Sequence, residues 1–399
     1  MWKSFRIGSL FGIPLRLDIT FLIILPVFAW IIGAQIEIMV DILNDFFDAG
    51  IDATTVSEGN RPWILGFISA IGLFVGVVLH ELGHSLTARR YGFPIESITL
   101  WLLGGVASFR EMPEDWRQEL NIAIAGPIVS IAVGVLSYGL FLITPEFADS
   151  VGTVTFQGAL FVFSYLAILN VFLAVFNMIP AFPMDGGRVL RALLARNRPY
   201  AKATQQAASI GRMFAIFFGI FGLLAFNIIL IAIAFFIYIA ASGEERHVML
   251  KAAFEGVTIG DIMTPKDRLR LVEPSLTIDE LIQRMFRERH TGYPVMTDGR
   301  LIGLVTLADA QQAQRSGQQG MTVENVMSTD LETIDPDTDV MEAIDRMQRE
   351  KIGRLLVVDN DQLVGLVTRT DVMTALEILQ RSGTMAFATT EVSSERPQL

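Results

Sequence analysis

Two histidines and a glutamate are clustered in the sequence His80-Glu81-Leu82-Gly83-His84. Residues four apart share one face of a helix, so both imidazoles can bind the same metal ion. Glu81 follows the first histidine, where its carboxylate can take a proton from a water that the metal activates. Short motifs also recur by chance, but ionisable groups within an apolar segment are costly and usually functional. The motif therefore predicts a catalytic metal site.

A catalytic zinc site requires a third protein ligand and an open coordination position. The chain has no cysteine, and its other two histidines, His247 and His290, lie outside the apolar part of the sequence. The candidate is Asp185, which follows a segment broken by Pro180 and Pro183. The alternative is that Asp185 only caps the helix that resumes there.

The depth of these residues in the bilayer favours the metal ligand. His84 precedes Arg89 by five residues, which is about 7–8 Å along a helix. Asp185 precedes Arg188 by three residues. Both segments therefore place their polar groups at the same end of the bilayer, where broken backbone is tolerated if it is buried or lines a water-filled cavity.

The composition divides the chain into a membrane part and a soluble part. The 399 residues are 52% hydrophobic, with a mean hydropathy of +0.47, and only 18% are charged. The long apolar runs fall in residues 1–242, whereas 243–399 is typical of a charged, soluble domain. A bilayer core of about 30 Å requires about 20 apolar residues per helix. Six spans are predicted, at 18–40, 63–88, 118–143, 157–179, 206–225 and 227–242.

Basic residues alternate with the predicted spans. They are concentrated in the N-terminal segment, in the loop after the second span and in the loop after the fourth. The positive-inside rule then places both termini, and the soluble part, in the cytoplasm of a multi-pass protein of the cell membrane. The first apolar run lacks a small-residue cleavage site and is expected to be an uncleaved anchor. The net charge of −11 argues against a nucleic-acid partner.

The membrane part resembles the site-2 protease family of intramembrane zinc metalloproteases. The resemblance rests on the motif at 80–84 and on Asn177 followed eight residues later by Asp185-Gly186, and it covers residues 1–242. It implies regulated intramembrane proteolysis, in which a membrane-anchored protein substrate is cut near the cytoplasmic face. It also implies one zinc ion per chain, with His80, His84 and Asp185 as its ligands.

The same resemblance implies two catalytic roles. Glu81 would be the general base. Asn177 would stabilise the scissile carbonyl as it becomes an oxyanion, a role that suits a preorganised amide donor. Asn177 could equally bond backbone groups that Pro180 frees. One position departs from the family, which often has asparagine after the Ala-Gly-Pro at 125–127 where this chain has Ser130.

Residues 96–111 are too short to span the bilayer and contain Gly104 and Gly105. They resemble the family's membrane-dipping β segment, which would present a strand edge to an unwound substrate and make the two glycines substrate-binding residues. The alternative is a simple surface hairpin.

The soluble part contains two copies of one unit, at 259–309 and 323–371. The run at 301–306 followed by Asp309 recurs at 363–368 followed by Asp371. In each copy, short apolar strands alternate with amphipathic helices. Two copies form a pseudo-symmetric pair rather than a solenoid.

This pair resembles cystathionine-β-synthase-type (CBS) domains. The resemblance implies an adenosine-containing ligand (ATP, ADP, AMP or S-adenosylmethionine) and a pairing mode that allows a homodimer. The ribose would contact a threonine and an aspartate in each copy, namely Thr306, Asp309, Thr368 and Asp371. These residue types also begin ordinary helices, so both interpretations stay open.

The sequence thus predicts a polytopic α-helical membrane domain of about six transmembrane helices, with a short membrane-dipping β segment, followed by an α/β CBS-domain pair. The predicted divisions are a metalloprotease domain at 1–242, a linker at 243–258, CBS domains at 259–315 and 320–380, and a disordered tail at 381–399. The rival function is a CBS-regulated membrane transporter or channel, which would spread its polar groups across the midplane. A metal-binding relative without catalysis is disfavoured because Glu81 is present.

Overall fold

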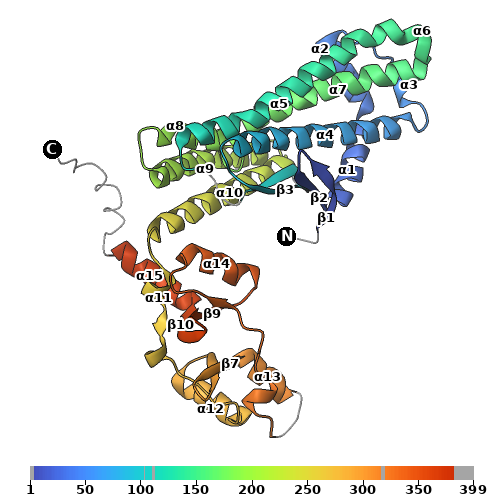
Figure 1. The fold of residues 1–399 in the computed structure, drawn as a ribbon. Coiled ribbons are helices and arrows are strands. Elements are labelled where there is room, and N and C mark those ends of the chain that lie inside the picture. The colour runs from blue at the N-terminus through green and yellow to red at the C-terminus, as the bar shows by residue number, and fades with distance from the viewer. Residues whose placement is uncertain (1–3, 103, 110–112, 316–319, 382–399) are drawn as a thin grey trace, which may run out of the picture. The chain divides into compact units, whose positions relative to one another are not determined.

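The structure is a computed structural model that describes residues 4–102, 104–109, 113–315 and 320–381. The chain forms two compact units, residues 1–246 and residues 247–399 (Figure 1). The predicted tail at 381–399 lies outside the described residues except for Arg381.

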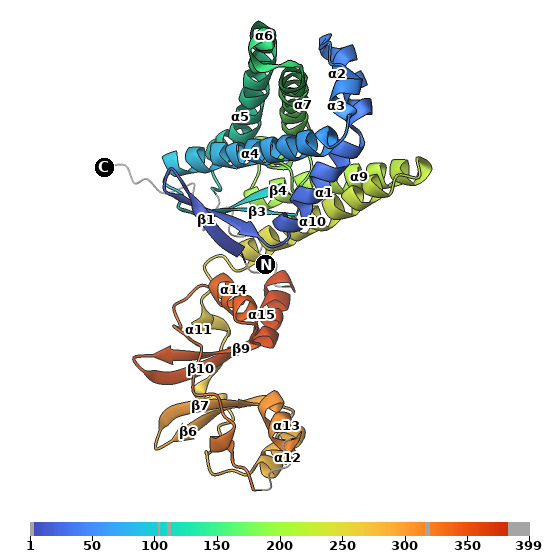
Figure 2. The same ribbon diagram turned by 90° about the vertical axis from the view of Figure 1, so that its right-hand side faces the viewer.

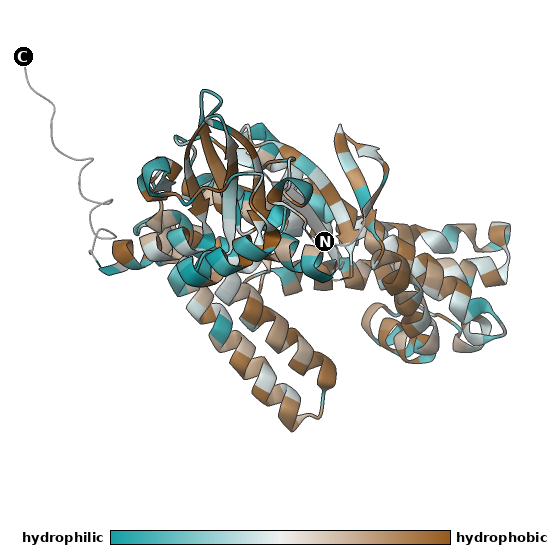
Figure 3. Cartoon of the chain, turned by 90° about the horizontal axis from the view of Figure 1, so that it is seen from below, coloured by the Kyte–Doolittle hydropathy of each residue, from teal (hydrophilic) through white to brown (hydrophobic). Residues whose placement is uncertain are grey.

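Within the residues that the structure describes, five helices are long and apolar enough to cross a membrane. They are α4 (Arg61–Arg90), α5 (Trp116–Ile143, extended by short turns to Val151), α7 (Thr153–Asn177), α9 (Tyr200–Leu224) and α10 (Ile228–Ala253). Most of their turns are hydrophobic, brown in Figure 3. A sixth span results if α1 (Phe21–Ala34) and α2 (Ile36–Phe47), which are bent by 68° at their junction, are counted as one. The predicted polytopic fold is confirmed, but its first span is broken rather than straight.

The helix α4 is the central element of this unit. It packs against α1, α5 and α7, and its 30 residues correspond to a length of about 45 Å. Two short helices, α3 (Ala53–Ser57) and α6 (Ala148–Val151), lie in the connections.

A four-stranded sheet lies beside α4 (Figure 2). Its order is β1 (Ser4–Leu10), β2 (Ile13–Asp18), β3 (Ile95–Trp101) and β4 (Gly104–Phe109). The β1–β2 hairpin turns at Phe11 and Gly12, whose φ angles of 51° and 83° are both positive, as a two-residue loop of type I′ requires. Strand β2 then pairs in parallel with β3, and β3 pairs antiparallel with β4.

The hairpin formed by β3 and β4 confirms that 96–111 is a β segment, within the residues described. The β1–β2 hairpin is not predicted from the sequence. Its pairing partner is far away in the chain, since Leu17 lies opposite Leu100. Both leucines belong to a cluster with Val77 of α4, so the hairpin depends on tertiary packing that local patterning does not reveal.

Two predicted breaks in the membrane helices are confirmed. The helix α7 ends at Asn177, before Pro180, and α8 (Asp185–Ala195) begins after Pro183. The second break separates α9 from α10, where the side-chain oxygen of Asn227 accepts a hydrogen bond from the backbone N–H of Leu230. Helix α10 then continues to Ala253, so most of the predicted linker is helical.

The second unit contains the two repeats. Their elements are α11 (Ile259–Ile262), β5 (Thr264–Pro265), α12 (Ile278–Glu288), β6 (Gly292–Thr297), β7 (Arg300–Thr306), α13 (Leu307–Arg315), β8 (Thr333–Ile334), α14 (Val340–Arg349), β9 (Arg354–Asp359), β10 (Gln362–Thr368) and α15 (Arg369–Arg381). Strands β6 and β7 form one sheet, and the other has the order β5-β10-β9-β8. Each repeat has its own apolar core. The predicted α/β pair is confirmed.

Candidate metal centre

The three predicted metal ligands meet at one point. His80 and His84 lie one turn apart on α4, and Asp185 is the first residue of α8. The Nε2 atom of His80 lies 3.0 Å from Oδ2 of Asp185 and 3.1 Å from Nε2 of His84. The distance from Nε2 of His84 to the same carboxylate oxygen is 3.2 Å. All three residues are buried.

These distances fit three ligands of one small cation. Zinc bonds of about 2.0–2.2 Å at tetrahedral angles place neighbouring ligand atoms about 3.3–3.6 Å apart, close to the separations seen here. The hydrogen bond of His84 supports this interpretation, because its Nδ1 lies 2.7 Å from the carbonyl oxygen of Ile122. A carbonyl only accepts, so Nδ1 carries the proton, and in a neutral ring Nε2 keeps its lone pair. That lone pair is directed at the cluster, as a metal ligand requires.

Helix α5 holds the second imidazole as well. The Nδ1 atom of His80 lies 2.8 Å from the hydroxyl oxygen of Ser130. Ser130 is the position at which the chain departs from the asparagine of its predicted family. The hydroxyl group contacts the imidazole directly and fixes the orientation of the ring.

A glycine on α5 leaves room for the two histidines. A Cβ atom at Gly126 would lie 2.2 Å from Nε2 of His84 and 2.7 Å from Nε2 of His80. The roles of Gly126 and Ile122 are not predicted from the sequence, because they depend on how α5 packs against α4. The only available signal is a glycine-proline pair inside an otherwise helical run.

The position of Asp185 depends on the two glycines that follow it. A Cβ atom at Gly186 would lie 2.3 Å from the carbonyl oxygens of Met178 and Ile179. The first turn of α8 therefore approaches the preceding backbone more closely than any larger residue would permit. The N-cap of α8 is Met184, and Oδ2 of Asp185 points to the imidazoles. The geometry is that of a metal ligand rather than of a helix cap.

Glu81 lies against the sheet, next in the chain to a residue of the metal cluster. It is the residue after His80 on α4, and β4 packs against it, since a Cβ atom at Gly105 would lie 2.5 Å from Cγ of Glu81. Gly104 begins β4 with a φ of +125°, which strongly favours glycine. Both glycines therefore lie at the strand that borders the predicted general base.

Asn177 is the last residue of α7. Its side-chain amide donates a hydrogen bond of 3.0 Å to the carbonyl oxygen of Leu173. The amide therefore bonds to backbone, as the second interpretation expects, but to the preceding turn of its own helix rather than to groups near Pro180.

The four predicted ligand residues of the repeats make local contacts. Oδ2 of Asp309 accepts hydrogen bonds from the backbone N–H and the hydroxyl of Thr306, at 2.8 and 2.7 Å. Asp371 and Thr368 repeat both contacts at the same distances. Each pair stabilises the start of the helix that follows its strand, α13 or α15.

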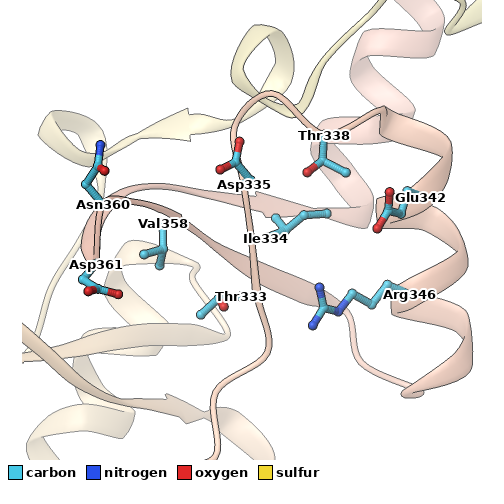
Figure 4. Close-up of a pocket in the computed structure, with 9 residues that line it drawn as sticks. All are labelled: Thr333, Ile334, Asp335, Thr338, Glu342, Arg346, Val358, Asn360 and Asp361. Atoms are coloured by element: carbon cyan, nitrogen blue, oxygen red, sulfur yellow. The ribbon is translucent and has the colours of Figure 1, made fainter.

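A pocket of the second repeat is lined by other residues (Figure 4). Residues of α14 and of the β9–β10 turn contribute to it, and neither Thr368 nor Asp371 lines it. Its lining residues are Thr333, Ile334, Asp335, Thr338, Glu342, Arg346, Val358, Asn360 and Asp361.

Comparison with known proteins divides the chain into the same two parts as the structure, a membrane part and a pair of repeats. Residues 68–220 match Peptidase family M50, and residues 259–315 and 323–378 each match the CBS domain. The chain is 37% identical over 377 residues to the zinc metalloprotease MJ0392 of Methanocaldococcus jannaschii. That match covers 94% of this chain and 97% of the archaeal protein.

Two solved structures are similar to separate parts of the chain. The site-2 protease from Methanocaldococcus jannaschii is 38% identical, with a TM-score of 0.39, and the match covers 61% of this chain and 96% of that one. The structure of CBSX2 from Arabidopsis thaliana in complex with AMP is 31% identical, with a TM-score of 0.29. This second match covers 31% of this chain and 98% of that one.

Proposed function

We propose a substrate class and a division of catalytic roles for a chain that belongs to peptidase family M50, the site-2 family of membrane zinc metalloproteases, and that carries two CBS domains. The proposed reaction is hydrolysis of a peptide bond in a membrane-anchored protein, near the cytoplasmic face. The convergence of His80, His84 and Asp185 at the end of an apolar helix is the observation that carries this proposal.

The ligand set fits zinc. Two imidazole nitrogens and one carboxylate oxygen are typical of a catalytic zinc site, which keeps a further position open. His80, His84 and Asp185 would hold the ion, while Ser130 and the carbonyl of Ile122 orient the two rings. When bound, zinc supplies a Lewis acid that polarises a carbonyl and makes water more acidic.

The remaining chemistry is assigned to side chains of this chain. Glu81 takes a proton from the attacking water and delivers it to the leaving amine. Asn177 would donate its side-chain amide to the developing oxyanion. That role requires the amide to leave its hydrogen bond to Leu173 when substrate binds.

The edge of β4 is proposed to bind the substrate. Among the described residues, β4 is an outer strand of the sheet, and Gly105 lies against Glu81. An exposed edge can pair with an extended peptide through backbone hydrogen bonds. A substrate helix must unwind to do so, because a folded helix already uses its carbonyl groups in internal hydrogen bonds. Nothing lies within 4 Å of a Cβ atom built at Gly104, so this position leaves space for a second backbone to approach.

The direct test of the catalytic role is Glu81→Gln. The variant should keep zinc and its fold, and should cleave a membrane-anchored reporter in proteoliposomes about 10²–10⁴-fold more slowly, the usual contribution of a general base. The matched control is Glu58→Gln, an exposed glutamate of the same unit whose side chain is 72% accessible, which should cleave at the normal rate. Near-normal turnover by Glu81→Gln would contradict the mechanism.

The proposed topology places both termini and the CBS pair in the cytoplasm. The basic residues of the first unit support it through the positive-inside rule. Cysteines introduced at the two ends of the chain should react with an impermeant thiol reagent only after the cell membrane is opened, because both ends are proposed to lie in the cytoplasm. The wild-type chain contains no cysteine, so no other thiol of the protein contributes to the signal.

The CBS pair is proposed to bind an adenosine-containing ligand and to regulate cleavage. The support is the repeated Thr–Asp pair, in which a hydroxyl donor and a carboxylate suit a ribose diol. Titration of the full-length protein with ATP, ADP, AMP and S-adenosylmethionine, followed by the reporter assay with the ligand that binds, tests both parts. A ligand that alters cleavage must bind the two states of the enzyme with different affinity.

A further inference from the structure

A buried arginine lies at the junction of four segments of the membrane unit. Arg191 of α8 is 1% exposed. Its Nε donates to Glu119 of α5 at 2.7 Å, and its Nη1 donates to Glu244 of α10 at 2.5 Å. The guanidinium group also lies over the rings of Phe182 and Tyr200, with its central carbon 4.9 Å from each ring centre. One side chain thus joins α8 to α5, α9 and α10.

Arg191 and two of the residues that it contacts lie close in the chain to residues of the metal centre. Arg191 lies six residues after Asp185 on α8, which is about 9 Å along the helix. Glu119 lies one turn before Ile122, whose carbonyl oxygen holds the imidazole of His84. Phe182 lies in the segment that directly precedes Asp185. Arg191 therefore contacts one residue close in the chain to the carbonyl that holds His84 and another close in the chain to Asp185.

Burial holds the ion pair between Arg191 and Glu119 in place. Glu119 is 1% exposed, so neither it nor Arg191 can exchange its partner for bulk water. An ionised group that loses its partner in such a place is strongly unfavourable. The planar guanidinium fork also fixes the directions of both carboxylates, which a lysine could not do. Glu244 differs from Glu119, because its side chain is 36% accessible.

We infer that Arg191 is a positioning residue for the metal centre, and that Glu244 sets the position of Arg191 from α10. Through Arg191, the helix α10 controls how firmly α8 holds Asp185 against the two histidines. Helix α10 is also the element that the CBS pair follows in the chain. The inference rests on the proposed role of Asp185 as a zinc ligand.

The test measures how fast zinc leaves the full-length protein. Zinc-loaded protein in detergent micelles is mixed with a chromogenic chelator, and the release rate is followed by absorbance. Glu244→Gln should release zinc about tenfold faster. Substitution of residues that orient metal ligands typically lowers metal affinity by about 10–100-fold, and we expect the lower end of that range here. The control is Glu245→Gln on the same helix, because its partner Arg212 lies on α9 rather than on α8. The control should release zinc at the wild-type rate.

A second variant tests whether Glu244 acts through Arg191. Arg191→Lys keeps the charge but loses the fork, and it should also accelerate release. Adding Glu244→Gln to Arg191→Lys should then cause no further acceleration. Glu244 is partly accessible, so its single variant is expected to stay folded even if Arg191→Lys does not.

The outcomes separate the inference from the proposed function. Asp185→Asn should release zinc faster than any of these variants, and a wild-type rate there would overturn the ligand assignment itself. If Asp185→Asn releases zinc quickly but Glu244→Gln behaves like Glu245→Gln, the proposed function stands and the positioning role of Arg191 is wrong.

Discussion

The metal centre and the Thr–Asp pairs of the repeats satisfy their polar groups in opposite ways. At the metal centre, His80 and Asp185 meet although 105 residues separate them, and α5 supports the imidazoles from a third direction. In the repeats, Asp309 bonds to Thr306, three residues earlier. The first arrangement requires the whole helix bundle, whereas the second is complete within one turn.

This difference shows how much a polar pattern says about function. A pair of residues that caps its own helix has a structural role that accounts for its presence. Polar groups that converge inside an apolar bundle have no such local role, and their cost must be offset by a ligand or by catalysis.

The largest effect is expected from Gly126→Ala on α5. The added Cβ atom would lie 2.2 Å from Nε2 of His84, so either the imidazole or α5 must move. Zinc affinity should fall by at least about tenfold, because α5 would no longer hold the imidazole of His84 in the orientation that binds zinc. The measurement is the zinc content of purified protein after dialysis against a buffered free-zinc concentration.

The matched control for that experiment is Gly139→Ala. Gly139 lies on the same helix, and nothing lies within 4 Å of a Cβ atom built there. It should keep wild-type zinc content and gain slightly in helix stability. Equal zinc content in both variants would mean that α5 does not support the ligands as the contacts imply.

The sequence predicts contacts within one helix better than contacts between helices that are distant in the chain. The spacing of His80 and His84 is enough to predict their shared face, because helix geometry fixes it. The shared depth of the two segments in the bilayer also predicts that Asp185 meets the two histidines. The contributions of Gly126 and Arg191 could not be predicted, since each depends on which helices pack against α5 and α8. Likewise, β2 has no local signal for its parallel partner β3, because the helices α1 to α4 lie between the two strands in the chain.

In the repeats, the sequence predicts the fold but does not decide the role of the candidate site residues. Their fold is predicted from the alternation of short strands and helices, and the structure confirms it. The site residues there are ambiguous in the sequence because Thr306 and Asp309 serve a helix start whether or not a ligand binds. Contacts that satisfy a cap do not distinguish the two roles, so only a substitution that separates them is informative.

Asp309→Asn separates the two roles in the first repeat. An asparagine oxygen can still accept from the backbone of Thr306, so the start of α13 should remain intact. The loss of charge should weaken AMP binding, which is measured by calorimetric titration of the full-length protein. By contrast, Asp309→Ala should remove the cap and destabilise α13 by about 1 kcal/mol, seen as faster hydrogen exchange at 307–315. If Asp309→Asn binds AMP like the wild type, the carboxylate is a helix cap only.

The smallest effect is expected at the start of α12, where the exposed pair Thr277 and Glu280 contains a titratable carboxylate. Thr277 caps this helix, and its hydroxyl donates to a carboxylate oxygen of Glu280 at 2.7 Å. This hydrogen bond lowers the pKa of Glu280 below its ordinary value of 4.5. Because the folded state has the lower pKa, the bond contributes stability above the ordinary pKa. That contribution is lost as the pH falls through the lowered value.

The measurement is the pH dependence of chemical shifts in the first turn of α12. The backbone amides of Thr277 and Glu280 should titrate together, with a midpoint below 4.5, and Glu280→Gln should abolish the transition. The second repeat offers the comparison, because its helix α14 is capped by Asp339, which accepts from the backbone of Met341. Glu280→Gln should leave the amides of α14 unchanged, since each cap is satisfied within its own turn. A change in α14 would show that the two repeats are coupled through their helix starts, and that even these local pairs act beyond their own helix.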